Sequence, residues 1–428
     1  MVKKQIIVNK TAFLKGVLKA PPSKSYTHRA IIVGSLDEHT NIINPLFCDD
    51  TIATINVMKK LGAFINRVSG DTDSLSICGF QRNPKIKGRV LNVEESGTLL
   101  RIALPLVALA KGKYTVLGEG TLRERPNKPI VDSLRFWGVD ISGRGEAHKL
   151  PITIDSNGLL KGGDITVSGR MSSQTISSLL IAASLAQQKT TVYIKDQLVS
   201  RPYVDITVDV LKWMGIRIKN TGYKSFKVYP RAELKVRGDY IVHGDFSSAA
   251  FLMAAACLVP SDVTITDLCR DKQGDRAIIN ILRRMGAVIE YKNDVVRIKG
   301  PFELRGIAVD CSDTPDLVPI LAVLGCFANG KTRIYNIEHL IYKESNRIAM
   351  PALELSKLGA RIGFTKREIF IKHSRLASAS VEPHNDHRLA MALAVAGLRV
   401  GLTLKSPCCV AKSYPNFFSD LRKLGAQL

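Results

Sequence analysis

The sequence predicts an α/β protein of two domains, each containing three similar units with two helices and several strands. Three observations lead to this fold class. A helical run that ends in glycine occurs six times, and an almost wholly apolar helix with a polar start precedes each of these glycines. Short apolar runs typical of strands separate the helices. Six such units pack most simply as two domains with pseudo-threefold symmetry.

The later of the two recurring helices in each unit ends in glycine. The copies read MKKLGAFI, LRFWGVDI, LKWMGIRI, LRRMGAVIEY, LSKLGARIGF and LRKLGAQL. Their glycines are Gly62, Gly138, Gly215, Gly286, Gly359 and Gly425. Glycine after an amphipathic helix predicts a left-handed C-terminal cap, because glycine has no Cβ to clash in that conformation. We expect these helices to lie on the outside of each domain.

The earlier of the two recurring helices is rich in Ala and Leu and opens on Ser, Thr, Asp or Asn. The six segments are SKSYTHRAIIVGSL, SGTLLRIALPLVALA, SSQTISSLLIAASLA, DFSSAAFLMAAACL, TPDLVPILAVLGCF and NDHRLAMALAVAGL. The polar residues supply N-terminal caps. Because these helices are apolar on nearly every face, we expect them to be buried.

Strands and the chain ends complete the prediction. KYTVLG, TTVYIKD, DVTITDL and TRIYNI are strand-like, whereas the sixth unit stops at LGAQL without the strands that should follow. We expect the N-terminal runs QIIVN and LKGVLKA to complete it, which puts both chain ends in one domain. The predicted domains are 1–21 with 240–428, and an inserted domain 22–239, with the active site in the cleft between them.

Composition excludes several classes of protein. The chain has 428 residues, a formal net charge of +23 and 45% hydrophobic residues, which is typical of globular domains. We find no signal peptide and no apolar stretch long enough to cross a bilayer. The eight cysteines show no CxxC spacing, which favours reduced thiols in the cytoplasm. Basic residues are scattered without a stacking motif, so we expect neither nucleic-acid nor membrane partners.

The helix starts indicate the kind of ligand. N-termini that converge make a positive focus, because their backbone N–H groups are unpaired and their dipoles align. Cations lie at or near these starts: Lys24, Arg29, Lys343, Arg347 and Arg388. Any one polar start is explained by capping alone, but recurrent cations at six starts favour a ligand with several negative charges.

Twelve segments in order resemble the 5-enolpyruvylshikimate-3-phosphate synthase family of enolpyruvyl transferases over the whole chain. They are PPSKSYTHRA, CDDT, ESGTLLR, ERPNKP, SGRMSSQ, LVSRPYVDIT, GDFSSAAF, KQGDR, TPDLVP, YKESNR, NDHRLAMALAV and AKSYP. The resemblance implies two domains of three βαβαββ-type units, each an inside-out α/β barrel. It also implies transfer of the enolpyruvyl group of phosphoenolpyruvate to the 5-hydroxyl of shikimate 3-phosphate, on the route to chorismate and aromatic amino acids. No metal or organic cofactor is implied, and we expect a monomer.

The resemblance also implies two sets of binding residues. The phosphoenolpyruvate site comprises Lys24, Gly97, Arg125, Gln174, Arg347, Arg388 and Lys412. The shikimate 3-phosphate site comprises Lys24, Ser25, Arg29, Ser172, Ser173, Gln174, Ser200, Asp316 and Lys343. Guanidinium groups suit this role because they bind carboxylate and phosphate through two parallel hydrogen bonds.

Four residues are the predicted catalytic groups. We expect Asp316 to be the base at the 5-hydroxyl and Glu344 to move the proton at the CH2 carbon, with Lys343 adjusting both and Lys24 at the phosphate. Without the resemblance, Asp316 would read as a helix cap. Asp49 and Asp50 lack further ligands nearby, so we predict no metal site.

Departures and alternatives stay open at this point. His339 stands where the family often has an Asn that contacts shikimate 3-phosphate, and Asn346 replaces a usual Asp. One alternative is the related enzyme that transfers enolpyruvyl to UDP-N-acetylglucosamine, whose loop cysteine is missing from 111–125 here. The other alternative is a non-catalytic, basic repeat protein that binds nucleic acid.

Overall fold

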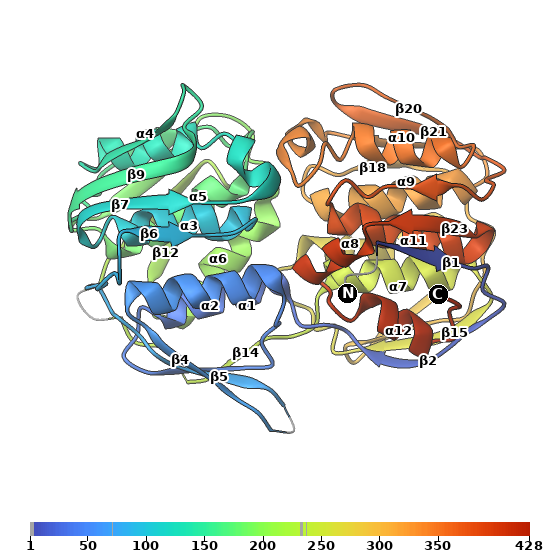
Figure 1. Ribbon diagram of the computed structural model, residues 1–428, viewed down its shortest axis with the longest axis horizontal. Coiled ribbons are helices and arrows are strands. Elements are labelled where there is room, and N and C mark those ends of the chain that lie inside the picture. Colours follow the sequence, from blue (N-terminus) through green and yellow to red (C-terminus); the bar gives the residue numbers. More distant parts are fainter. Residues whose placement is uncertain (1–3, 71, 232–233, 237) are drawn as a thin grey trace. The chain divides into compact units, whose positions relative to one another are not determined.

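A computed structural model describes residues 4–70, 72–231, 234–236 and 238–428. The chain divides into two compact units (Figure 1). Unit 1 combines Met1–Pro21 with His243–Leu428, and unit 2 is Pro22–Val242. Residues 1–3, 71, 232, 233 and 237, which fall within the predicted domains, lie outside the described residues.

Unit 2 contains six α-helices, one 3-10 helix and twelve strands in its described part. Its helices are α1 (Lys24–Gly34), α2 (Asp49–Leu61), α3 (Gly97–Val107), η1 (Gly120–Glu124), α4 (Lys128–Phe136), α5 (Ser173–Leu185) and α6 (Arg201–Trp213). Its strands are β3 (Thr40–Ile43), β4 (Phe64–Val68), β5 (Ser74–Cys78), β6 (Val90–Asn92), β7 (Lys111–Leu117), β8 (Asp140–Arg144), β9 (Lys149–Asn157), β10 (Ile165–Val167), β11 (Thr190–Ile194), β12 (Arg217–Thr221), β13 (Ser225–Tyr229) and β14 (Tyr240–Ile241).

Unit 1 has the same kinds of element. Its helices are α7 (Phe246–Leu258), η2 (Gly274–Arg276), α8 (Ala277–Arg284), η3 (Pro315–Leu317), α9 (Val318–Phe327), η4 (Glu338–Tyr342), α10 (Ala349–Lys357), α11 (His387–Val400), η5 (Pro407–Lys412) and α12 (Phe417–Lys423). Its strands are β1 (Gln5–Val8), β2 (Leu14–Lys19), β15 (Ser261–Thr266), β16 (Ile289–Lys292), β17 (Val295–Ile298), β18 (Ala308–Asp310), β19 (Lys331–Tyr335), β20 (Arg361–Phe364), β21 (Glu368–Lys372), β22 (Ser380–Val381) and β23 (Leu402–Lys405).

Each unit has three sheets, and the sheets repeat one pattern of pairing. Unit 2 holds the orders β14-β3-β5-β4, β6-β7-β9-β8 and β10-β11-β13-β12, and unit 1 holds β2-β15-β17-β16, β18-β19-β21-β20 and β22-β23-β1. In every sheet the first pair is parallel and the following pairs are antiparallel. The predicted threefold repetition within each unit is therefore confirmed.

The N-terminal strands differ in part from the prediction. β1 takes the third place in the sheet of β22 and β23, so the run QIIVN does complete the last repeat. The run LKGVLKA does not: β2 pairs in parallel with β15, in the sheet of the repeat that begins with α7. β14 has the equivalent place beside β3 in unit 2. In both units, a strand that enters from outside the repeat supplies the first, parallel position.

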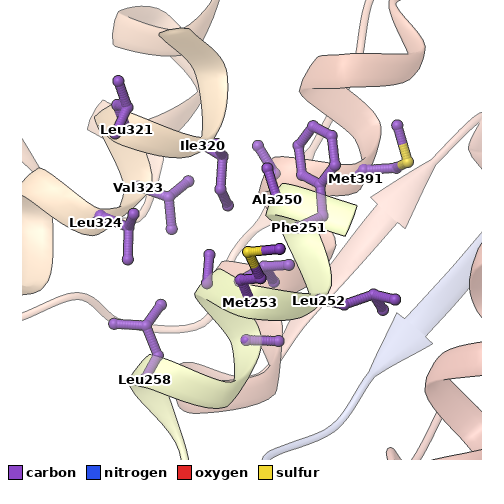
Figure 2. Close-up of a cluster of buried hydrophobic side chains, with 14 of the residues drawn as sticks. Ala250, Phe251, Leu252, Met253, Leu258, Ile320, Leu321, Val323, Leu324 and Met391 are labelled. Atoms are coloured by element: carbon purple, nitrogen blue, oxygen red, sulfur yellow. The ribbon is translucent and has the colours of Figure 1, made fainter. Parts of the chain in front are cut away.

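The apolar helices form the cores, as predicted. Every residue of α7 is buried, and α7, α9 and α11 pack against one another in unit 1. Figure 2 shows this packing, with Phe251 and Met253 of α7, Ile320 of α9 and Met391 of α11 among the side chains drawn. Burying an aliphatic or aromatic side chain of this size contributes about 1.5–3 kcal/mol to folding. The buried helices thus anchor the residues at their own N-termini.

The repeated glycines confirm the predicted caps. The six φ values are 112° at Gly62, 90° at Gly138, 79° at Gly215, 103° at Gly286, 93° at Gly359 and 105° at Gly425. L-residues with a Cβ rarely adopt this left-handed conformation. The first five of these glycines therefore allow an outer helix to turn toward the next strand, and Gly425 follows the last helix of the chain.

No helix in the described ranges is long and apolar enough to span a bilayer. All eight cysteines are free thiols.

Candidate functional site

In unit 2, predicted residues gather at the N-terminal ends of α1, α3 and α5. Lys24 is the first residue of α1 and Gly97 the first residue of α3. The N-cap of α5 is Ser172, whose hydroxyl accepts the N–H of Gln174 at 3.2 Å. α3 packs against α5, and α1 and α5 both pack against α6. Packing of the buried helices thus brings residues that are far apart in sequence to one part of the unit.

Gly97, Arg101, Arg125 and Gln174 form what we call the Arg125 cluster. A Cβ at position 97 would lie 3.0 Å from Nη1 of Arg125 and 3.2 Å from Nη1 of Arg101. The glycine therefore lets two guanidinium groups approach the start of α3. Arg125 is 7% exposed and donates to the Thr121 hydroxyl at 3.4 Å.

Arg101 is a member of this cluster that the sequence analysis missed. Its Nη1 donates to Gln174 Oε1 at 2.8 Å, and its Nη2 donates to the carbonyl of Pro126 at 3.2 Å. The amide nitrogen of Gln174 in turn donates to Thr98 Oγ1 at 3.0 Å. Arg101 therefore holds Gln174 and the segment after Arg125 in place. The available signal was a cation one turn inside an apolar helix, four residues after Gly97.

Lys24 and Arg29 lie on α1 with different surroundings. Lys24 makes an ion pair with Asp50 at 2.8 Å. Arg29 is 2% exposed and donates to Thr207 Oγ1 at 2.7 Å, and to the carbonyls of Ser25 and Tyr203 at 2.9 and 3.1 Å. Burial lowers the pKa of Arg29 to about 10, so its side chain stays charged at neutral pH. In this state Arg29 joins α1 to α6.

The predicted serines of unit 2 lie at helix starts. Ser25 is the second residue of α1, and Ser173 is the first residue of α5 and is buried. Ser200 is the N-cap of α6 and has a φ of 54°. A non-glycine residue in this left-handed region carries backbone strain, which is common at functional sites.

In unit 1, two arginines and three carboxylates form what we call the Arg347 cluster: Asp316, Glu344, Arg347, Asp386 and Arg388. Arg347 is 1% exposed. Its Nη1 lies 2.5 Å from Asp316, its Nη2 2.7 Å from Glu344, and its Nε 2.7 Å from Asp386. Burial lowers the pKa of Arg347, but the three carboxylates outweigh it and raise the pKa above its ordinary value.

Asp316 lies between the two arginines of this cluster. Its Oδ1 accepts from Arg347, and its Oδ2 lies 3.4 Å from Nη2 of Arg388. Burial raises the pKa of Asp316, but Arg388, Arg347 and Lys343 outweigh burial and hold it well below its usual range. Asp316 is thus ionised at neutral pH, and its carboxylate occupies guanidinium groups that could bind another anion.

Asp386 is the second residue that the sequence analysis missed. It is fully buried as the N-cap of α11 and accepts the N–H of Arg388 at 2.9 Å. Its side chain also accepts from Arg347 and from the Ser345 hydroxyl, the latter at 3.0 Å. One carboxylate therefore holds the side chain of Arg347 and the backbone of Arg388. The capping pattern NDHR was visible in the sequence, but the bond to Arg347 depends on tertiary structure.

Asp275 adds a further buried carboxylate beside this cluster. Its Oδ2 accepts the Ser247 hydroxyl at 2.5 Å. Burial and the charge of Asp316 raise its pKa, with Arg388 opposing. KQGDR was part of the family pattern, but no role was predicted for this residue.

Lys343, His339 and Lys412 complete the neighbourhood. Burial and then Lys343 lower the pKa of His339 to about 3, with Asp316 opposing, so the imidazole is neutral. Within the described ranges neither ring nitrogen of His339 has a hydrogen-bond partner, although the residue is only 4% exposed. Lys412 Nζ donates to the carbonyl of Asn385 at 3.0 Å. His339 therefore offers a polar group that the protein itself leaves unsatisfied.

Predicted residues are thus collected in two separate groups, one in each unit. Asp316, Lys343, Glu344, Arg347, Arg388 and Lys412 belong to unit 1, and all other predicted site residues belong to unit 2. In the described part of the chain, no three His, Cys, Asp or Glu side chains are grouped as a metal site would require.

Comparisons with known proteins agree on one family. The family model for EPSP synthase (3-phosphoshikimate 1-carboxyvinyltransferase) matches residues 8–421. A 3-phosphoshikimate 1-carboxyvinyltransferase from Methanocella arvoryzae is 43% identical over 96% of this chain and 97% of its own length. The same enzyme from Methanocaldococcus jannaschii is 40% identical over 99% of both chains. An EPSP synthase structure from Acinetobacter baumannii superposes with a TM-score of 0.82 at 27% identity, covering 98% of each chain.

Proposed function

The chain belongs to the EPSP synthase (3-phosphoshikimate 1-carboxyvinyltransferase) family, and we propose that each of its two units supplies half of one active site. The reaction transfers the 1-carboxyvinyl group of phosphoenolpyruvate to the 5-hydroxyl of shikimate 3-phosphate and releases phosphate. The predicted family, fold class and activity are confirmed by these relatives. The residue roles below, and a cleft between the units, are our proposals.

The Arg347 cluster binds the carboxylate of phosphoenolpyruvate in this proposal. Arg347 and Arg388 both approach the Asp316 carboxylate, so a substrate carboxylate has two guanidinium donors within reach. Lys412, held at the carbonyl of Asn385, adds a third cation. The approach of two buried guanidinium groups, Arg347 and Arg388, to the one Asp316 carboxylate is the observation that carries the proposed function.

The Arg125 cluster and Lys24 bind phosphate. Arg125 and the first N–H groups of α3 lie around Gly97, where a missing side chain admits an anion to the backbone. Lys24 exchanges Asp50 for the phosphate of phosphoenolpyruvate. Gln174, held by Arg101 and Thr98, lies where both substrates meet.

Shikimate 3-phosphate binds to the hydroxyl groups at the starts of α1, α5 and α6. The phosphate accepts hydrogen bonds from Ser172, Ser173 and Ser200. Ser25 lies beside it on α1, and Arg29 contributes mainly by joining α1 to α6, because its donors are already used within the unit. His339 faces this substrate with Lys343, where a hydroxyl of the ligand can satisfy its unpaired ring nitrogens.

Proton transfer belongs to Glu344 and Asp316. Glu344 must enter this step in its protonated form: it gives its proton to the CH2 carbon of the enol, C2 becomes cationic, and the 5-hydroxyl attacks C2 while Asp316 removes the hydroxyl proton. The product of this step is a tetrahedral ketal phosphate. Phosphate then leaves with the proton that Asp316 took from the 5-hydroxyl, and return of a CH2 proton to Glu344 restores the double bond in the product. Lys343 adjusts both carboxylates, and Lys24 stabilises the phosphate as it leaves.

Substrate binding itself prepares Asp316 for this step. With Arg347 and Arg388 beside it, the pKa of Asp316 is too low for an efficient base. The carboxylate of phosphoenolpyruvate draws these guanidinium groups toward itself and weakens their hold on Asp316. The pKa of Asp316 then rises only when the donor substrate is in place.

Phosphate release tests the proposed function. The protein with phosphoenolpyruvate alone should release almost no phosphate, and addition of shikimate 3-phosphate should start release together with formation of the enol ether. Replacement of shikimate 3-phosphate by UDP-N-acetylglucosamine should leave the protein inactive. Phosphate release from phosphoenolpyruvate with the nucleotide sugar, but not with shikimate 3-phosphate, would overturn the assignment. We further propose that the protein is a cytoplasmic monomer that acts on these small anions without nucleic acid, membrane or metal. Gel filtration tests whether it is a monomer, and activity in the presence of a chelator tests whether it needs a metal.

A further inference from the structure

Glu354 is a buried carboxylate outside all the groups described so far. It lies in the second turn of α10 and is 1% exposed. Its Oε1 accepts from Nε2 of His384 at 2.7 Å, and its Oε2 accepts the backbone N–H of Glu382 at 2.9 Å. Lys357 Nζ lies 2.8 Å from both oxygens. Burial raises the pKa of Glu354, but these hydrogen bonds outweigh burial and lower it, so the carboxylate is ionised.

Two of these partners belong to residues 382–386, a segment with a strained backbone. His384 has a φ of 51° and Asn385 a φ of 59°. Left-handed conformations cost free energy in residues other than glycine, so contacts with the surrounding structure help to hold His384 and Asn385 there. Glu354 is placed to do so, because it binds the segment through one backbone and one side-chain group.

The same segment ends at groups of the proposed phosphoenolpyruvate site. The carbonyl of Asn385 accepts from Lys412, and Asp386 accepts from Arg347 and caps the helix that begins before Arg388. Segment 382–386 is therefore held at two points, by a residue just before α10 and by a residue within α10. Arg347, two residues before α10, holds its end, and Glu354 holds its beginning.

We propose that Glu354 and His384 are positioning residues for the phosphoenolpyruvate site, an inference that rests on the proposed function. Their hydrogen bond keeps His384 and Asn385 in the left-handed conformation. That conformation directs the Asn385 carbonyl to Lys412 and places Asp386 between Arg347 and the start of α11. Neither Glu354 nor His384 touches the substrate, and their effect reaches it through these cations.

The test compares His384→Ala with His384→Gln and Lys357→Ala. Alanine and glutamine have similar backbone penalties at a left-handed position, but only glutamine can donate to Glu354. Lys357 donates to the same carboxylate from a side chain that is 49% exposed, and no hydrogen bond to segment 382–386 involves it among the described residues. It is therefore the matched control for the loss of a hydrogen-bond donor to Glu354.

We expect His384→Ala to raise the KM for phosphoenolpyruvate by about tenfold or more, because small displacements of binding groups are costly. The KM for shikimate 3-phosphate should remain nearly unchanged. His384→Gln should recover most of the loss, and Lys357→Ala should behave like the parent protein. If His384→Ala does not fold, Glu354→Gln replaces it with the same expectation.

Equal effects on both KM values, no rescue by glutamine, or an equal loss in Lys357→Ala would overturn the positioning role. A parent protein that releases no phosphate with both substrates would instead overturn the proposed function, so the two failures are distinct.

Discussion

Replacement of Asp316 by Asn tests the proposed base and its competition with the donor substrate. Asparagine has nearly the same shape and keeps an oxygen that can accept from Arg347 Nη1, which lies 2.5 Å from Asp316 Oδ1. It cannot take up the proton of the 5-hydroxyl. General base catalysis contributes roughly 10²–10⁴-fold to a rate. We therefore expect kcat to fall by that factor, which corresponds to about 3–5 kcal/mol of activation free energy.

The same substitution should strengthen binding of phosphoenolpyruvate. In the proposed site, Asp316 competes with the substrate carboxylate for Arg347 and for Arg388, whose Nη2 lies 3.4 Å from Asp316. A hydrogen bond to a charged acceptor is about 1 kcal/mol stronger than one to a neutral acceptor. Loss of the charge should thus lower the dissociation constant for phosphoenolpyruvate roughly fivefold.

Steady-state phosphate release gives kcat, and calorimetric titration of phosphoenolpyruvate into the protein without shikimate 3-phosphate gives the dissociation constant. Asp262→Asn is the control, because Asp262 pairs with Arg297 at 3.0 Å in the same unit and has no proposed role in substrate binding or proton transfer. An unchanged kcat would remove Asp316 as the base. A lower kcat with weaker binding of phosphoenolpyruvate would refute the competition between the two carboxylates.

Three further predictions concern single features of the site. Arg125→Ala should raise the KM for phosphoenolpyruvate roughly ten- to hundredfold and the KM for shikimate 3-phosphate less, because a charged hydrogen bond contributes about 1.5–3 kcal/mol. Steady-state kinetics measure both KM values, and a larger rise for shikimate 3-phosphate would mean that the two subsites are exchanged. Gly97→Ala puts a Cβ 3.0 Å from Nη1 of Arg125, so the KM for phosphoenolpyruvate should rise while the thermal midpoint stays nearly constant, and an equal KM would show that Arg125 does not contact this substrate. The folded-state pKa of Asp316 is lowered, so its carboxylate stabilises the fold above its ordinary pKa of about 4 and loses that contribution as the pH falls through the lower folded value. The calorimetric thermal midpoint should therefore decline less with acid in Asp316→Asn than in the parent protein, and identical pH profiles of the two proteins would contradict the lowered pKa.

The repeated fold could be predicted because its signals are local. A glycine cap needs only its own φ, and all six predicted glycines have the expected positive values. A helix apolar on every face must be buried, as all of α7 is. The place of LKGVLKA could not be predicted in this way, because β2 pairs with a strand more than 240 residues away in sequence. Strand pairing at that separation leaves no local pattern.

The position of some candidate site residues in the fold could be predicted for the same reason. Lys24, Gly97 and Arg388 lie at helix starts, which capping patterns reveal. Arg101 and Asp386 were missed because their importance lies in contacts with Gln174 and Arg347, which come from other repeats. Nothing in the sequence indicated that Arg347 would be bound by three carboxylates at once.

Spin labels on the chain's own cysteines test most directly whether both units close on the two substrates. Cys78 of unit 2 and Cys408 of unit 1 are exposed, and with Cys269→Ser the remaining thiols are buried. Pulsed electron resonance then measures the distance between the two labels without ligand, with each substrate alone and with both. We expect both substrates together to shift and narrow the distance distribution, because the proposal has cations of both units bind the same pair of anions. A distribution that stays the same under all four conditions, in a protein that still turns over, would contradict a shared site.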